Sequence, residues 1–578
     1  MTIGPTLPIS QAIHAEKYRD IGETFDGMCV RICRKLADND KHFNQTLEIL
    51  REQRFLPAGR VQAAVGSPKQ VTAFNCFVAS TIDDSSDSIF AVVKEAWDTM
   101  RKGGGIGFDF STLRPRGDLI ESLNSRASGP VSFMDIFDAT CRCVQSAGHR
   151  RGAMLGALRV DHPDIMEFIR AKQTPGRLTA FNVSVGATDE FMEAVKSGKT
   201  YWTTFKGKKY QELDARTVWD IIMDNTWDWA EPGVLFVDRI NNMNNLWYAE
   251  TIVTTNPCGE QPLPPNGACL LGSFNLVKYV TANTPELYPG KIIRVGAPSF
   301  NYDQFEQDIR AIVPFMDNII DNTIYPLRKQ EIEAKNKRRM GLGITGVANA
   351  LEIMGYSYGS EEYIKEQSKI LEILRDVAYD QSVEVARVKG VFPLFDAEKW
   401  LESGYGQSLP QGLKKRIRKY GLRNSHLLSI APCGTISLCA DNVSSGIEPV
   451  FSHEQERTIN ESQGPVTYKL TDYAYRTYGL KGKTADQVTA EEHIKVQCAA
   501  QYYVDSSVSK TCNIGPDVGF REFQGLYMMA YEGGAKGCTT FRATGKRMGI
   551  LKAVETKDDG EGKACTIDPT TGIKTCDE

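Results

Sequence analysis

Two hydrophobic patterns alternate along this chain. One repeats about every 3.6 residues, the period of an amphipathic helix. It predicts helices over 88–101, 130–146, 303–323, 361–389, 490–509 and 520–531. The other pattern consists of short apolar and β-branched runs, which predict strands at 181–185, 251–255 and 427–431. Helices that alternate with short strands are typical of an α/β fold with parallel strands.

The two ends of the chain differ from its middle. Helical signals in residues 1–70 stop at Pro57 and Gly59, which predicts a helical N-terminal lead-in. Residues 551–578 are rich in Asp, Gly, Thr and Lys and lack periodicity, which predicts a flexible C-terminal tail. We therefore expect three parts, with the main α/β domain in residues 71–550.

The composition narrows the class of protein. Of 578 residues, 41% are hydrophobic and 24% are charged, and the formal net charge is -4. No apolar run reaches the roughly 18–20 residues of a membrane helix, and the start lacks a signal-peptide pattern. We expect a soluble cytoplasmic protein with no membrane partner. Without a basic stripe, polymeric nucleic acid is not an expected partner either.

Fourteen cysteines are too few for a disulfide scaffold in a chain of this length, and we expect reduced thiols. Cys29 and Cys33 lie one helical turn apart, but no second Cys/His pair accompanies them, so no metal site is predicted. Five cysteines stand in more unusual surroundings and are candidates for chemistry: Cys76, Cys258, Cys269, Cys565 and Cys576.

The most informative segment is the Asn-Pro-Cys-Gly-Glu run at 256–260. In an extended chain alternate side chains share a face, so Asn256, Cys258 and Glu260 would project together. That arrangement combines a hydrogen-bonding amide, a reactive thiol and an acid/base carboxylate. The alternative is an ordinary Pro/Gly turn without chemistry.

Other motifs accompany this segment along the chain. They are Asn75-Cys76, the glycine-rich run 104–108, the loop 148–154, Cys269, Pro-Cys-Gly-Thr-Ile-Ser at 432–437 and Ser-Ser-Gly-Ile-Glu-Pro at 444–449. Together with Asn256 to Glu260, these motifs resemble the catalytic subunit of a ribonucleotide reductase, in the family's order from about Phe55 to Arg547. The resemblance implies a ten-stranded α/β barrel with a central finger loop that carries Cys258.

The resemblance also implies roles for five residues. Cys258 becomes a thiyl radical that removes the ribose 3′ hydrogen, while Glu260 takes the 3′-hydroxyl proton and Asn256 holds the ribose hydroxyls. Cys76 and Cys269 deliver the reducing equivalents and finish as a disulfide. Cys76 also protonates the departing 2′-hydroxyl.

Further residues are assigned to the substrate and to the reductant. Asn75 is expected to bind the ribonucleotide, and three residues with backbone and hydroxyl donors are expected to bind its phosphates: Gly434, Thr435 and Ser437. Cys565 and Cys576 are expected to reduce the internal disulfide and to be reduced by thioredoxin or a glutaredoxin-like protein. Their separation by ten residues departs from the family's close spacing.

The same resemblance implies regulation by a deoxynucleoside triphosphate such as dTTP. The expected effector-binding residues are Asp84, Ser85, Arg114 and Arg116, and the segment 146–155 would relay the effector's identity. Because the family binds effectors where two subunits meet, we expect an effector-dependent homodimer. Only about 55 residues precede the landmark at 57–60, so we expect no N-terminal nucleotide-binding cone.

Missing features indicate the radical source. Subunits fed by a separate metallo-radical protein carry a Tyr-Tyr pair before the last barrel arginine, where this chain reads Cys-Thr-Thr-Phe-Arg at 538–542. No glycyl-radical motif follows either. The chain most resembles the adenosylcobalamin-dependent class, with the Lys-Gly-x-Thr pattern at 536–539. A separate metallo-radical subunit remains the alternative, and the choice between diphosphate and triphosphate substrates stays open, with diphosphates favoured.

Two other functions compete with this interpretation. Gly341, Gly343 and Gly346 form a Gly-x-Gly-x-x-Gly pattern, which would suit an NAD-dependent dehydrogenase. Such a motif must follow an apolar strand, whereas the charged run 333–339 precedes it here. A non-enzymatic nucleotide sensor is the second rival, but it leaves the cysteines at 76, 258 and 269 without a purpose.

Overall fold

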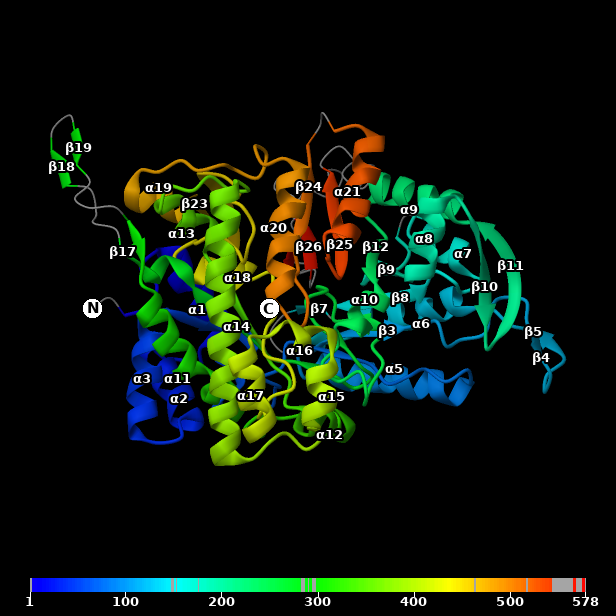
Figure 1. Ribbon diagram of the computed structural model, residues 1–578, viewed down its shortest axis with the longest axis horizontal. Coiled ribbons are helices and arrows are strands. Elements are labelled where there is room, and N and C mark those ends of the chain that lie inside the picture. The colour runs from blue at the N-terminus through cyan, green and yellow to red at the C-terminus, as the bar shows by residue number, and fades with distance from the viewer. Residues whose placement is uncertain are drawn as a thin grey trace.

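The computed structural model describes most of the chain (Figure 1). The described residues are 3–146, 150–151, 153–174, 176–281, 286–288, 291–293, 298–461, 464–515, 518–542, 565–567 and 574–576. Helices and strands alternate through these residues, which confirms the α/β class. Among the described helices, none has both the length and the apolar character needed to cross a bilayer.

An eight-stranded sheet forms one part of the molecule. Its strand order is β15-β2-β3-β8-β9-β12-β25-β24. The bounds are β15 Ala268–Cys269, β2 Cys76–Val78, β3 Gly105–Asp109, β8 Met154–Arg159, β9 Phe181–Ala187, β12 Gly233–Phe236, β25 Gly537–Arg542 and β24 Thr511–Ile514. Strands β2, β3, β8, β9 and β12 run parallel, whereas β15 and β25 pair antiparallel with β2 and β12.

A three-stranded sheet continues directly from this one. Strand β16 (Leu271–Asn275) follows β15 after a single residue and pairs in parallel with β21 (Gly341–Thr345), while β1 (Phe55–Pro57) pairs antiparallel with β16. The predicted strand at 427–431 makes only single bridges, Leu342 with Leu428 and Ile430 with Val508. In the described residues, the ladders with more than two strands therefore form an eight-stranded and a three-stranded sheet and not one closed ten-stranded barrel.

Helices pack around two large hydrophobic cores; in Figure 1 the helices of the first lie to the left of β24, and most helices of the second lie to the right of β25. One core takes in α1 Pro8–Tyr18, α2 Phe25–Leu36, α3 Asp40–Arg51, α11 Tyr302–Asp321, α13 Val347–Ile353, α14 Glu361–Lys389 and α17 Gln411–Tyr420. The other takes in α5 Ser86–Arg101, α6 Pro130–Cys143, α7 Ile165–Arg170, α8 Asp189–Ser197, α9 Ala215–Trp229 and α21 Phe520–Glu532. Helix α20 (Ala490–Tyr503) contributes residues to both cores and links them.

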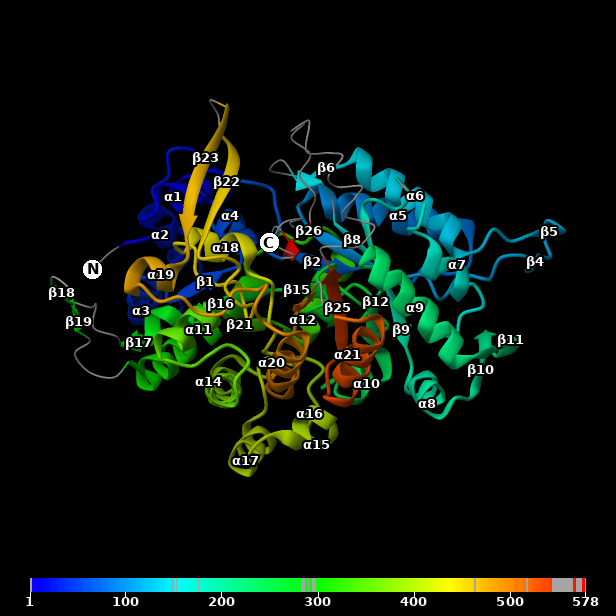
Figure 2. The same ribbon diagram turned by 90° about the horizontal axis from the view of Figure 1, so that it is seen from above.

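Helices predicted from periodicity agree well with the structure. Helix α14 spans Glu361–Lys389, the predicted range, because Ser360 caps its first turn by accepting a hydrogen bond from the Tyr363 amide and glycine follows its last residue. Helix α20 ends at Tyr503, six residues before the predicted end, because the chain continues there as a segment that leads into β24 and bridges Ile430 through Val508. Two hairpins project from the body, β10–β11 (Thr200–Phe205 and Lys208–Asp214) and β22–β23 (Glu454–Glu461 and Gly464–Thr471, Figure 2).

The dinucleotide-binding interpretation of the glycine pattern is wrong. Gly341 and Gly343 lie inside β21 and not in a loop after a strand. A Cβ on Gly343 would lie 2.4 Å from the carbonyl oxygen of Ser429, so this glycine serves close packing between neighbouring chain segments.

Candidate active site

The segment 256–261 is the loop of a short hairpin. Strands β13 (Thr254–Thr255) and β14 (Pro262–Leu263) pair antiparallel and bring its two ends together. The Gly259 amide donates a hydrogen bond to the Asn256 carbonyl oxygen (3.1 Å), and φ of Gly259 is +85°, a value that favours glycine. The expected extended conformation is therefore wrong: a turn, and not strand alternation, gathers the functional side chains.

Within this loop Asn256 and Glu260 contact each other directly. The Asn256 side-chain amide donates to Oε1 of Glu260 at 2.7 Å, and Oδ1 of Asn256 accepts from the Gln261 amide at 3.0 Å. Both side chains are buried, with exposed fractions of 0% and 1%, whereas Cys258 between them is half-buried. The loop thus fixes the carboxylate and presents the thiol.

Cys76 and Cys269 lie opposite each other across β2 and β15. The register of this antiparallel pair makes them Cα partners. Directly opposed residues in such a pair have Cα atoms about 4.5–5.5 Å apart, within the roughly 4.4–6.8 Å that a disulfide spans. Cys269 is buried and Cys76 is half-buried. The strands therefore hold two cysteines within reach of a disulfide.

Two glycines of β3 bring the hairpin loop against these cysteines. A Cβ on Gly105 would lie 3.2 Å from Sγ of Cys76 and 3.2 Å from Cγ of Pro257. A Cβ on Gly107 would lie 1.9 Å from the carbonyl oxygen of Thr255. Sequence reasoning noted this glycine-rich run but missed its role. Glycines at alternate positions in a buried strand were the available signal, because they permit close backbone approach.

The expected phosphate-binding residues begin a short helix, α18 (Gly434–Cys439). Cys433 precedes it with φ of +42°, and Thr435 and Ser437 are buried. Gly434 and Ser437 line a cavity. Asn75, with an exposed fraction of 6%, has no hydrogen-bond partner for either amide atom among the described residues. A buried amide of this kind needs a partner, and its position beside Cys76 fits a bound polar ligand.

A second cavity, of about 550 Å³, contains some of the expected effector-binding residues. Asp84 and Ser85 line it, and Asp84 accepts a hydrogen bond from Nε of Arg114 at 2.9 Å. Arg116 does not line it: its backbone amide donates to Asp164, and its guanidinium pairs with Glu167 at 2.8 Å. Sequence reasoning missed several lining residues, which come from distant segments: Ser111, Thr112, Arg159, Asp161, His162 and 204–206.

The segment expected to relay the effector's identity is only partly described. Strands β6 (Gln145–Ser146) and β7 (Arg150–Arg151) pair antiparallel, while 147–149 and 152 lie outside the described residues.

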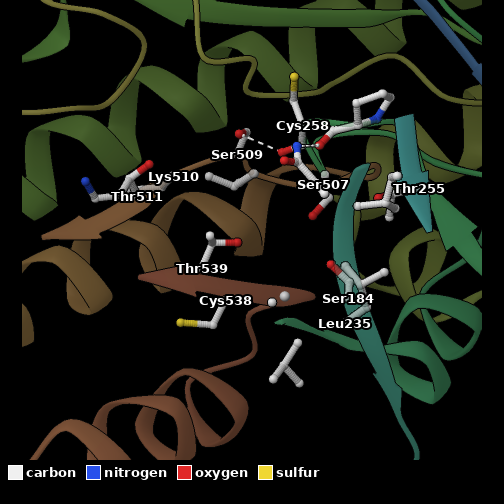
Figure 3. A pocket seen from close by; sticks show the side chains of 18 of the residues that line it. Ser184, Leu235, Thr255, Cys258, Ser507, Ser509, Lys510, Thr511, Cys538 and Thr539 are labelled. Atoms are coloured by element: carbon white, nitrogen blue, oxygen red, sulfur yellow. Dashed lines mark hydrogen bonds between the residues drawn. The ribbon is translucent and has the colours of Figure 1, made fainter. Parts of the chain in front are cut away.

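A third cavity adjoins Cys258 (Figure 3). Its lining includes three glycines, Gly233, Gly259 and Gly537, and hydroxyl side chains from β9, β24, β25 and the segment before β24. Figure 3 shows the Cys258 sulfur pointing away from β25, which carries Cys538 and Thr539. At the place of the family's Tyr-Tyr pair, β25 carries Thr539 and Thr540.

The two tail cysteines lie in paired strands. Strands β26 (Cys565–Ile567) and β27 (Lys574–Cys576) are antiparallel, and their register makes Cys565 and Cys576 Cα partners. Strand β27 lies against α18, and Figure 2 shows β26 near the middle of the molecule. The hairpin thus brings the two positions opposite each other despite their separation in sequence.

Comparison with known proteins agrees with this geometry. The family model described as "Ribonucleotide reductase, barrel domain" matches residues 74–541. The chain is 32% identical to the vitamin B12-dependent ribonucleoside-diphosphate reductase of Thermoplasma acidophilum, over 93% of this chain and 70% of that protein. It is 32% identical to a protein of that name from Mycobacterium tuberculosis, over 88% of this chain and 73% of the relative. The ribonucleoside-diphosphate reductase subunit alpha of Helicobacter pylori is 25% identical over 83% of this chain and 72% of that protein. The matched range contains the hairpin loop, the facing cysteines and α18, and the chain therefore belongs to the ribonucleotide reductase family.

Proposed function

We propose that this chain reduces ribonucleoside diphosphates to 2′-deoxyribonucleotides and depends on adenosylcobalamin. The observation that carries the proposal is the hairpin loop with Cys258 at its tip, packed through Gly105 and Gly107 against the strand next to Cys76 and Cys269. This arrangement places one half-buried thiol near a pair of thiols that can form a disulfide.

Each side chain has a role in the proposed reaction. The thiyl radical of Cys258 removes the ribose 3′ hydrogen atom, and Glu260, held by Asn256, accepts the proton of the 3′-hydroxyl. Cys76 protonates the departing 2′-hydroxyl, and Cys76 and Cys269 together supply two electrons and become a disulfide. Glu260 then returns its proton to the 3′ oxygen, and Cys258 gives the hydrogen atom back to C3′ and becomes a thiyl radical again.

Around this loop we propose the ten-stranded barrel of the family. Five parallel strands, β2, β3, β8, β9 and β12, form one half. For the other half we assign β16, β21, the segment 428–430, β24 and β25, a series supported by the bridges of Leu342 with Leu428 and Ile430 with Val508.

We place the cofactor at the cavity beside Cys258. A Cβ on Gly259 would meet no atom within 4 Å, and the two charged side chains in the lining are already paired, Lys510 with Glu448 and Glu231 with Lys172. Ser184, Ser507 and Thr539 would offer hydroxyl groups to such a ligand. Adenosylcobalamin supplies the one-electron chemistry that oxidises a thiol. A rotation about the Cα–Cβ bond of Cys258 would turn its sulfur into this cavity.

The remaining assignments complete the cycle. Asn75 and the donors of Gly434, Thr435 and Ser437 bind the substrate, and the tail hairpin regenerates the facing thiols with electrons from thioredoxin or a glutaredoxin-like protein. A deoxynucleoside triphosphate such as dTTP occupies the cavity at Asp84 and Ser85 and favours a homodimer.

An anaerobic assay tests this function. The chain is incubated with CDP, dTTP, a dithiol and adenosylcobalamin, and the product is analysed. We expect deoxycytidine diphosphate from the wild type and none from Cys258→Ala. Cys498→Ser changes another half-buried thiol and serves as the matched control, with activity retained. Product only on addition of a metallo-radical subunit would overturn the cofactor assignment, and product from Cys258→Ala would overturn the mechanism.

A further inference from the structure

The backbone of the hairpin loop is held by a second segment, residues 505–511, which we name the clamp segment. The Ser507 amide donates to the carbonyl oxygen of Glu260 at 2.9 Å. The Ser509 hydroxyl donates to the carbonyl oxygen of Cys258 at 2.8 Å, as Figure 3 shows. The clamp segment therefore binds the backbone on both sides of Gly259, at the residue that carries the thiol and at the residue that carries the carboxylate.

One end of the clamp segment is fixed by a buried ion pair. Lys510 donates to Oε2 of Glu448 at 2.6 Å, and the Lys510 side chain has an exposed fraction of 0%. The other carboxylate oxygen, Oε1, accepts from the backbone amide of Thr511 at 2.8 Å. A single carboxylate thus holds both a side chain and the backbone of the residue that follows it.

The other end is fixed by a different buried lysine. Nζ of Lys536 donates to the carbonyl oxygens of Asp505 and Ser506, each at 2.6 Å. Between the two ends, Ser509 donates through its amide to Ile430 at 2.8 Å. Because both ends and the middle are bonded, the hydroxyl of Ser509 has a defined position relative to Cys258.

From these contacts we infer that Lys510 and Glu448 are positioning residues for Cys258. Neither touches the thiol. They act through Ser509, since a shift of the clamp segment moves the donor that holds the Cys258 carbonyl. A displacement of about 1 Å at a reacting group is enough to lower a rate by roughly 100-fold. The pair therefore controls where the radical-bearing sulfur sits relative to the substrate, a role that rests on the proposed function of Cys258.

Each partner of the ion pair between Lys510 and Glu448 depends on the charge of the other. Removing one partner leaves an unpaired charge in a buried place, so the remaining group must move toward water or another partner. Lys510→Met leaves the Glu448 carboxylate without its cation, whereas Lys510→Arg keeps the charge. Glu448→Gln keeps an acceptor for the Thr511 amide and removes the charge.

The test measures the Cys258 thiol directly, without cofactor or turnover. The full chain is treated with iodoacetamide, and peptide mass spectrometry follows alkylation of Cys258, with Cys498 as an internal reference. We expect Lys510→Met to change the Cys258 alkylation rate at least fivefold relative to Cys498, Lys510→Arg to restore it, and Glu448→Gln to give an intermediate rate. In the activity assay, kcat should fall at least tenfold for Lys510→Met while the KM for CDP stays within twofold.

Lys337→Met is the matched control, because Lys337 also forms a buried ion pair, with Glu250 at 2.7 Å. It should lower stability without changing the ratio of Cys258 to Cys498 alkylation. Equal ratios for Lys337→Met, Lys510→Met and wild type would overturn the inference, as would a Lys510→Arg variant no better than Lys510→Met. If Lys510→Met does not fold, Glu448→Gln and Ser509→Ala decide the question through the same ratio. Absence of deoxynucleotide product from the wild type would instead count against the proposed function, because the alkylation comparison does not depend on turnover.

Discussion

Cys76 and Cys269 are Cα partners in the antiparallel pairing of β2 with β15, although 192 residues separate them in the chain. This geometry predicts which cysteines are oxidised in the first turnover. In a variant with both Cys565 and Cys576 changed to Ser, which removes exchange with the tail, reduced enzyme that receives substrate without an external reductant should form one disulfide, joining these two cysteines. Peptide mapping under non-reducing conditions checks the pairing. A disulfide from Cys258 to either residue as the main product would contradict it.

The tail hairpin predicts a separation between physiological and artificial reductants. Cys565 and Cys576 are Cα partners in β26 and β27, and β27 lies against α18; in the proposed cycle this pair reduces the internal disulfide. Changing both to Ser should abolish turnover driven by thioredoxin and preserve turnover driven by a small dithiol. Cys143→Ser, at an exposed thiol of α6, is the control and should preserve both. Thioredoxin-driven turnover at the wild-type rate in the double variant would refute the shuttle.

Gly107 predicts a steric requirement at the base of the hairpin. A methyl group there would lie 1.9 Å from the Thr255 carbonyl oxygen, so Gly107→Ala must displace β13 from β3. We expect the free energy of unfolding to fall by about 1–3 kcal/mol, with loss of activity. Gly525→Ala in α21 meets no atom within 4 Å and should be neutral or stabilising by about 0.5–1 kcal/mol. Urea unfolding and the CDP assay measure both effects, and an active, equally stable Gly107→Ala variant would disprove the requirement.

The cavity at Asp84 predicts different contributions from two expected effector residues. Asp84 holds two cations at the cavity, Arg114 at 2.9 Å and Lys206 at 3.3 Å, whereas Arg116 is engaged with Glu167. Asp84→Asn should weaken dTTP binding at least tenfold because it releases both cations. Arg116→Ala should change binding less than twofold. Isothermal titration with dTTP distinguishes them, and equal losses would require a different effector site.

A buried carboxyl group predicts a pH dependence of stability. Burial, with a smaller contribution from the nearby Asp472 carboxylate, raises the pKa of Glu352 to about 8. The folded state therefore retains a proton that the unfolded chain releases near the ordinary glutamate pKa of about 4.3. Because of this difference, the free energy of unfolding falls as the pH rises from about 4.3 to about 8. Each pKa unit corresponds to about 1.4 kcal/mol.

Glu352→Gln removes this titration. Its urea midpoint should therefore change less between pH 5 and pH 8 than that of the wild type, by the equivalent of a few kcal/mol. If the urea midpoints of the two proteins change equally with pH, the pKa of Glu352 is not raised in the folded state.

Local patterns predicted the helices well and the site only in part. Helix α14 follows from its own periodicity and caps, but the bridges at Leu428 and Ile430 depend on strands far away in the chain. The Asn256 to Glu260 motif was expected on an extended segment, whereas the structure has it on a hairpin loop, because a hairpin requires the partner strand β14 to be recognised. The pairing of Cys76 with Cys269 is a long-range contact that no local spacing encodes.

The position of Cys269 links chemistry to mechanical strength. Strand β15 leads after one residue into β16, so Cys269 stands at the joint between the eight-stranded and three-stranded sheets. In the proposed cycle a covalent cross-link closes and opens at this joint with every product released. In the chain-entropy model, a disulfide that closes the loop between Cys76 and Cys269 stabilises the folded state relative to the unfolded state by about 5 kcal/mol. The melting temperature should therefore be higher for the oxidised enzyme than for the reduced enzyme. A melting curve of a mixed sample then measures the fraction of molecules that hold the disulfide and have not yet been reduced.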